Sequence, residues 1–211
     1  GVGGPPVRLA HPNRVSHVCF SPDGARIATA CDDAIIRIWR TADGTLEREL
    51  PKADDRIPQV AFDATGRQLA AAVRSGELLV WDLATAACET WSPANQKPLR
   101  AVCFSPDGHW LVVAGAERTV AVWNTTLRRR VANLVGHNQE IFCLDISPNG
   151  ELIASGDTGG AIRLWHAALR RPLATLEGYA GPVMALHFAV DGRTLVSASL
   201  DGTLRVWDLT Y

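Results

Sequence analysis

Residues 15–39 read VSHVCFSPDGARIATACDDAIIRIW, and Trp39 at the end of this stretch begins a series of tryptophans spaced 42 residues apart. The later members are Trp81, Trp123, Trp165 and Trp207. A second column with the same spacing holds Phe20, Phe62, Phe104, Ile146 and Phe188. The four residues after each member of that column are SPDG, DATG, SPDG, SPNG and AVDG. Self-similarity at a fixed period is the mark of a repeat architecture, so the chain consists of five copies of one unit.

Each unit contains four segments that read as strands. The tryptophan ends a run with alternating side chains, such as IIRIW at 35–39, and a period of two with β-branched residues predicts a strand. Two apolar segments precede it, at 15–20 and 26–30 in the first unit, and the SPDG between them suits the turn of a hairpin. A short segment after the tryptophan, at 45–50, supplies the fourth strand. We therefore expect a four-stranded antiparallel sheet from every unit.

A repeat of about 42 residues with SPDG and a final tryptophan-aspartate pair resembles the WD-repeat β-propeller family. Trp81-Asp82 and Trp207-Asp208 keep the naming dipeptide, and the resemblance covers nearly the whole chain. It implies an all-β fold in which residues 1–211 form a single five-bladed WD-type β-propeller with four antiparallel strands per blade.

The ends of the chain raise the question of ring closure. Residues 6–10 occupy a fourth-strand position before the first complete blade, and the last repeat stops after its third strand. We predict that the N-terminal strand joins the last blade and closes the ring, which would make the protein a monomer. The alternatives are an open arc or closure between two chains, because five blades must each turn by about 72°.

Composition sets limits on function. Charged residues make up 20% of the chain and the formal net charge is -1, which favours neither a nucleic-acid nor a membrane partner. The N-terminus lacks the features of a signal peptide, so we expect a cytoplasmic protein. The five cysteines form no CxxC pair and are interpreted as reduced, mostly buried thiols, without a zinc site or disulfides. No cofactor is predicted.

The first repeat contains a set of residues that superficially resembles an acyl-transfer triad. The resemblance to the WD-repeat family implies that this set is a buried, hydrogen-bonded structural tetrad instead. Its members are His11, Thr29, Asp33 and Trp39. The same columns lose one or more members in every other repeat, as at Ala71 and Val113 in the hydroxyl column. We therefore predict a complete tetrad in the first repeat alone, no catalytic residues, and a protein that is not an enzyme.

In this family, the loops before the first strand and between the second and third strands share one face of the propeller, called the top face below. Loops on a rigid scaffold commonly carry binding sites, so we predict a non-catalytic scaffold for a protein or peptide partner. The candidate partner-binding residues are Asn13, Arg14, Asp32, Arg56, Arg74, Lys97, Gln139, Glu140, Asp157, Tyr179 and Leu200.

The opposite face offers an alternative site. Its candidates are Arg128, Arg129, Arg130, Arg170 and Arg171, which could meet a phosphate-bearing or acidic partner. Glutamates in neighbouring repeats, and the lack of interleaved aromatic residues, argue against nucleic acid. A further alternative is an engineered or evolutionary model propeller, or a fragment of a larger WD-repeat protein, with no ligand of its own. Five units without net insertions favour this alternative, and the divergence of the copies argues against a consensus design.

Overall fold

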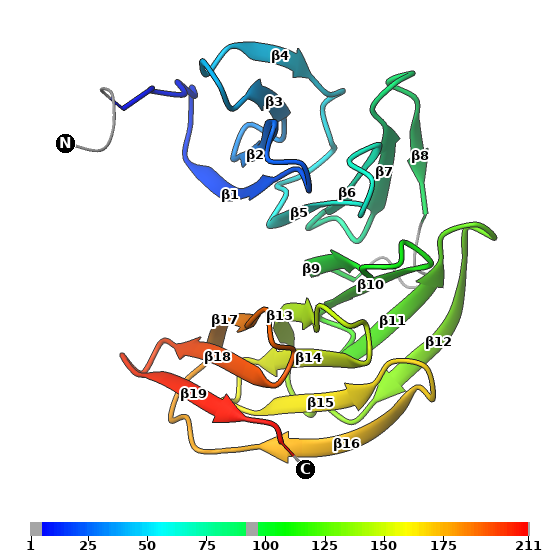
Figure 1. Cartoon of the computed structure of the whole chain (residues 1–211), viewed down its shortest axis with the longest axis vertical. Helices are drawn as coiled ribbons and strands as arrows, with labels where there is room; N and C mark the ends of the chain where they lie inside the picture. Colours follow the sequence, from blue (N-terminus) through cyan, green and yellow to red (C-terminus); the bar gives the residue numbers. More distant parts are fainter. Residues whose placement is uncertain (1–5, 92–96, 211) are drawn as a thin grey trace.

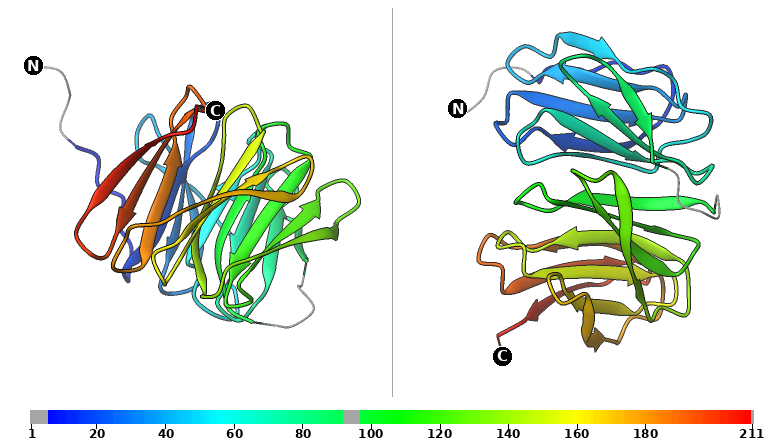
Figure 2. Two further views of the ribbon diagram at one scale, coloured as in Figure 1. Left: turned by 90° about the horizontal axis from the view of Figure 1, so that it is seen from below. Right: turned by 90° about the vertical axis from the view of Figure 1, so that its right-hand side faces the viewer.

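A computed structural model describes residues 6–91 and 97–210 of the chain. Every regular element in these ranges is a β-strand, and the nineteen strands form five antiparallel sheets arranged as the blades of a propeller (Figure 1). The predicted all-β, five-bladed fold is confirmed. In the right-hand view of Figure 2, the sheets of blades 1 and 2 lie at one end of the molecule and those of blades 4 and 5 at the other, with blade 3 between them.

The strands follow the repeat closely. Blade 1 consists of β1 (Val15–Phe20), β2 (Arg26–Cys31), β3 (Ile36–Arg40) and β4 (Leu46–Glu49). Blade 2 consists of β5 (Gln59–Phe62), β6 (Gln68–Ala72), β7 (Leu78–Asp82) and β8 (Cys88–Thr90). Blade 3 consists of β9 (Leu99–Phe104), β10 (Trp110–Gly115), β11 (Thr119–Asn124) and β12 (Arg129–Val135). Blade 4 consists of β13 (Ile141–Ile146), β14 (Leu152–Asp157), β15 (Ile162–His166) and β16 (Arg171–Leu176). Blade 5 consists of β17 (Val183–Phe188), β18 (Thr194–Ser199) and β19 (Leu204–Asp208).

The SPDG segment of blade 1 and its equivalents in the other repeats close the first hairpin of each blade, as their sequence predicts. The backbone N–H of Ser21 donates to the carbonyl of Arg26 at 2.9 Å, and that of Gly24 donates to the carbonyl of Ser21 at 2.8 Å. Gly24 has a φ of 67°, a conformation that glycine adopts without steric cost. These turns fix the register of the first two strands, so each repeat begins as the same rigid hairpin.

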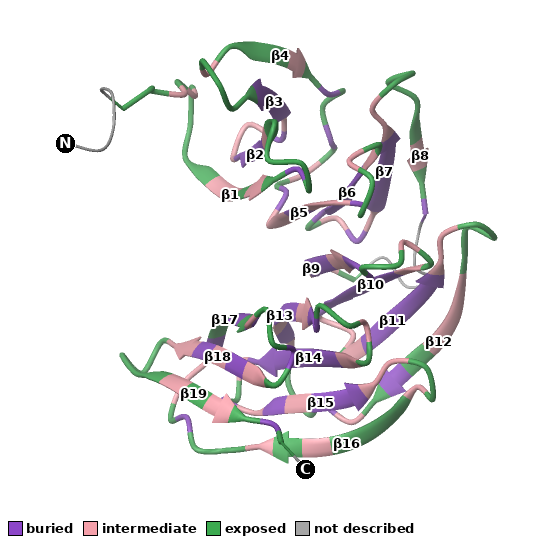
Figure 3. Cartoon of the chain, in the orientation of Figure 1, coloured by how far each residue is buried: buried purple, intermediate pink, exposed green. Residues whose placement is uncertain are grey.

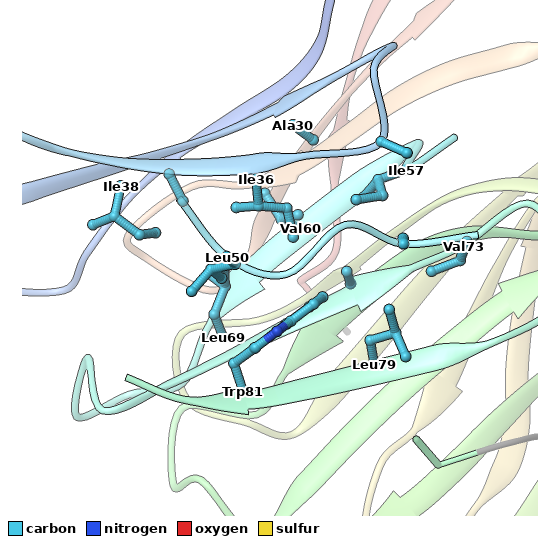
Figure 4. Close-up of a cluster of buried hydrophobic side chains, with 14 residues drawn as sticks. Ala30, Ile36, Ile38, Leu50, Ile57, Val60, Leu69, Val73, Leu79 and Trp81 are labelled. Atoms are coloured by element: carbon cyan, nitrogen blue, oxygen red, sulfur yellow. The ribbon is translucent and has the colours of Figure 1, made fainter. Parts of the chain in front are cut away.

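The hydrophobic core lies between neighbouring blades. In Figure 4, Ile36 and Ile38 from β3 of blade 1 lie close to Val60, Leu69 and Trp81 of blade 2, and all five are buried. Alternation along each strand sends one set of side chains toward the preceding blade and the other set toward the following blade. The same pattern recurs between blades 2 and 3, 3 and 4, and 4 and 5.

The last blade departs from the prediction, because its sheet has three strands and residues 6–10 form no strand. The side chain of Val7 lies instead against Gly44 in the turn between β3 and β4. The fourth strand of blade 1 meets the next blade in a similar way, since Arg48 donates to the carbonyl of Leu83 at 2.8 Å. Residues 6–10 thus lie beside the blade that follows them and do not pair with β19. The prediction of a ring closed by this segment is corrected to an open arc.

Exposed apolar side chains on β1 and β19 mark the opening between blades 1 and 5. Blades 1 and 5 face each other across a gap in Figure 1, and in Figure 3 much of β1 is exposed whereas the middle strands are buried. Phe20 on β1 is 61% exposed, whereas its equivalent Phe104 is 7% exposed. Val206 on β19 is 64% exposed, whereas its equivalent Ile38 is 3% exposed. The four closely packed cores set the angle between neighbouring blades. At this angle blades 1 and 5 do not meet, so no fifth core forms between them.

Candidate functional site

The complete hydrogen-bonded tetrad lies in blade 4. Nδ1 of His137 is 2.7 Å from Oδ2 of Asp157, and Nε2 of His137 is 2.7 Å from Oγ of Ser155. Nε1–H of Trp165 donates to the same Ser155 oxygen at 2.8 Å. All four residues are buried, and burial lowers the pKa of His137 even though Asp157 opposes that shift. Asp157, a predicted top-face contact, is therefore corrected to a structural residue.

Blade 1 has three members of the predicted tetrad. Nε2 of His11 is 2.8 Å from Oγ1 of Thr29, which accepts Nε1–H of Trp39 at 2.8 Å. Asp33 does not join them, because it accepts from Arg37 at 2.9 Å and from the backbone of Ile35 at 3.0 Å. The prediction of a complete tetrad in this repeat is corrected accordingly. The position equivalent to Asp157 is occupied by Cys31, two residues before Asp33.

Blade 5 contains a modified version of this hydrogen-bonded network. Tyr179 takes the place of the histidine, with its hydroxyl 2.6 Å from Oγ of Ser197, and Trp207 donates to that oxygen at 2.8 Å. Tyr179 is buried, so this second top-face candidate is also corrected to a structural residue.

Blades 2 and 3 lack the hydroxyl. The buried Nε1–H groups of Trp81 and Trp123 have no acceptor among the described residues. The equivalents of Thr29 are Ala71 and Val113, which cannot accept a hydrogen bond.

The remaining top-face candidates are brought together by backbone pairing. The N–H of Asp32, after β2, donates to the carbonyl of Arg14, before β1, at 2.8 Å. The N–H of Arg74 donates to the carbonyl of Arg56 in the same way at 2.9 Å. In these two blades the entering loop and the loop between the second and third strands therefore lie side by side.

A cavity of about 570 Å³ lies where the first strands of the five blades converge, and it is called the axial cavity below. Four predicted residues line it, namely Arg14, Asp32, Arg56 and Arg74. The other predicted residues are outside its lining: Asn13, Lys97, Gln139 and Leu200 are exposed, and Glu140 is half-buried.

Sequence reasoning missed Arg100, Phe142 and Met184, which also line the axial cavity. They occupy equivalent positions, 42 residues apart, on the first strands of blades 3, 4 and 5. The sequence signal that could have identified this part of the cavity is an arginine between Leu99 and Ala101, in an otherwise apolar strand.

Three of the four arginines that line the axial cavity form ion pairs. Oδ2 of Asp32 is 3.3 Å from Arg14 and 3.7 Å from Arg56, and Arg100 is 2.7 Å from Glu140. Arg74 makes no ion pair with any described residue. Burial lowers the pKa of His17, the neighbouring imidazole, which keeps it neutral at pH 7.

Three of the five arginines predicted on the opposite face contact side chains of the same molecule. Arg128 pairs with Glu89, and Arg130 lies 3.6 Å from Glu117. The guanidinium of Arg170 lies over the ring of Trp110 at 4.8 Å. Arg129 and Arg171 are exposed at the starts of β12 and β16. Three of the five guanidinium groups are thus already engaged within the molecule.

The part of the chain that the structure describes contains no cluster of histidine, cysteine and carboxylate side chains able to hold a metal ion. It also has no helix long and apolar enough to span a membrane. All five cysteines are free thiols, and burial raises the pKa of Cys19, Cys103 and Cys143 to about 12.

Comparison with known families agrees with this architecture. The family model described as WD domain, G-beta repeat matches residues 4–40, 88–124, 128–166 and 170–208. These matches span well over half of the chain, so the protein belongs to the WD40 family. The repeat outside them is the one around Trp81, where the histidine and hydroxyl columns hold alanine. No curated protein matches the sequence.

Proposed function

We propose that the protein is a non-catalytic scaffold that binds a protein or peptide partner on its top face, at the axial cavity. WD40 propellers are generally interaction scaffolds. The observation that carries the proposal is the convergence of side chains from all five blades on this one cavity. Concave sites with a few polar groups are common binding sites, and here the rigid sheets hold those groups in fixed positions.

The hydrogen-bonded networks support a non-catalytic role. A catalytic serine needs an accessible oxygen next to a base. Ser155 is fully buried, and its oxygen already bonds to His137 and Trp165. These contacts make the residue part of the framework that positions the loops.

We extend the proposal to a cytoplasmic location. Its support is the set of five free thiols, which a reducing compartment preserves.

Site-specific photo-crosslinking tests the scaffold proposal. A crosslinking amino acid at Leu200, which is 69% exposed on the top face, should capture a partner from cell extract. The matched control is Leu169, which is 59% exposed in the turn before β16 on the opposite face. Enrichment of one protein at Leu200 and not at Leu169 supports the proposal. Equal capture at both positions, or none, would contradict it, and the absence of capture is what a propeller without a ligand predicts.

A further inference from the structure

Blade 2 differs from the other blades in what it presents at the axial cavity. In each blade, the residue that enters the first strand is backbone-bonded to the residue that follows the second strand. In blade 2 this pair is Arg56 and Arg74, so two guanidinium groups extend from neighbouring backbone positions. The other pairs are Arg14 with Asp32, Pro98 with Ala116, Glu140 with Thr158, and Pro182 with Leu200.

The charges at this site do not balance. Arg14 and Arg56 share the single carboxylate of Asp32, and Arg100 has Glu140. Arg74 adds a fourth guanidinium, so four positive groups meet two negative ones, an excess of two positive charges. Asp55, in the same loop as Arg56, accepts the backbone N–H of Arg56 at 2.7 Å and does not line the cavity. An anion bound between Arg56 and Arg74 would relieve the repulsion between them.

The axial cavity has two chemically different walls. All of its charged lining residues come from blades 1 to 3. Blade 4 contributes Phe142, Cys143 and Leu144, and blade 5 contributes Met184, Ala185 and Leu186. Met184 is 38% exposed, so it is accessible to a ligand. A ligand that fits both walls carries an anionic group next to an apolar group.

We propose that the axial cavity binds a phosphorylated segment of a partner protein. The phosphate lies between Arg56 and Arg74, and an adjacent apolar side chain packs on Phe142 and Met184. A phosphorylated side chain carries close to two negative charges at pH 7 and three acceptor oxygens, and this matches the charge excess and the two guanidinium groups. The inference rests on the proposed scaffold function and specifies the chemistry of its partner.

A peptide library provides the test. Immobilised protein is offered degenerate peptides with a central phosphoserine, and the same library with serine. We expect the phosphorylated library to be retained preferentially, with apolar residues enriched beside the phosphoserine. Arg74→Ala should lower retention by roughly tenfold, the loss of one charge-assisted contact. Arg74→Lys should restore it only partly, because an ammonium group cannot form the bidentate contact.

Two controls make the result specific. Arg171→Ala removes an exposed arginine on the opposite face and should leave retention unchanged. Met184→Asp should abolish the apolar preference, and its effect should exceed that of Arg171→Ala. Thermal unfolding of each variant establishes that it folds.

The outcomes separate this inference from the scaffold proposal. Equal retention of both libraries, or retention that Arg74→Ala leaves unchanged, overturns the inference, and capture through Leu200 would still support the scaffold. If inorganic pyrophosphate displaces the peptides and no flanking residue is enriched, the site takes a free phosphate compound and the peptide assignment is wrong. Failure of both the library and the crosslinking experiment would refute both proposals.

Discussion

Replacing Ser155 with alanine tests the central hydroxyl of the buried tetrad in blade 4. Its hydroxyl joins His137 at 2.7 Å and Trp165 at 2.8 Å, and all three residues are buried. Alanine leaves both ring nitrogens without their partner and opens only a small space. An unsatisfied buried polar group costs roughly 1–3 kcal/mol, so Ser155→Ala should lower the free energy of unfolding by about 4 kcal/mol. For a chain of this size, that corresponds to a fall in Tm of roughly 10 °C.

The reverse substitution provides a matched control within the same molecule. Ala71 is the blade 2 equivalent of the serine, and it lies in the same buried cluster as Trp81, whose buried Nε1–H lacks an acceptor among the described residues. Ala71→Ser should therefore stabilise the protein by about 1 kcal/mol. Calorimetry and denaturant titration measure both effects. A loss below about 1 kcal/mol for Ser155→Ala, or a destabilised Ala71→Ser, would refute the role assigned to the network.

The remaining predictions concern the opening, the thiols and pH. Phe20→Asp should leave the free energy of unfolding within about 1 kcal/mol of wild type, whereas Phe104→Asp should lower it by at least about 3 kcal/mol. The difference is expected because only Phe104 is buried between blades. Equal losses of stability in urea titrations would show that the ring closes in solution. Iodoacetamide should modify Cys88, the exposed cysteine, before the other four thiols, and peptide mass spectrometry would contradict this if a buried thiol reacted first. Burial lowers the folded-state pKa of His17 and His137, so the unfolded chain takes up more protons below about pH 6.5, and stability should fall as the pH drops from 7 to 5. A Tm that stays constant over that range, or that changes equally in His17→Gln, would contradict the assignment for His17.

The local parts of the fold could be predicted because their causes are local. Alternation toward Trp39 defines β3, and SPDG at 21–24 defines the first hairpin without reference to any other blade. The opening could not be predicted in this way. It depends on the angle at which packed side chains of different blades set neighbouring sheets, and a repeat period carries no information about that angle.

The site shows a similar division. The resemblance to the family implied that Arg14, Arg56 and Arg74 lie on loops of the top face, and the structure places these residues in the lining of the axial cavity. Asp157 was misassigned because the tetrad aspartate lies two residues earlier in blade 4 than in the aligned column. Asp33 was misassigned because Arg37 competes for its carboxylate. Both errors have the same cause: the hydrogen-bond partner of each carboxylate is the group that lies closest to it in three dimensions, and the position in the repeat does not determine that group.

The open ends have a consequence for how such a chain can grow. The equivalents of Val206 are buried in all four complete interfaces, and those of Phe20 are buried or half-buried, so both ends of the arc carry ordinary interface chemistry. A further 42-residue copy added at either end of the arc would meet a surface already suited to it. A blade gained by duplication of one gene segment would therefore need no new kind of contact, and the established blades would keep their neighbours.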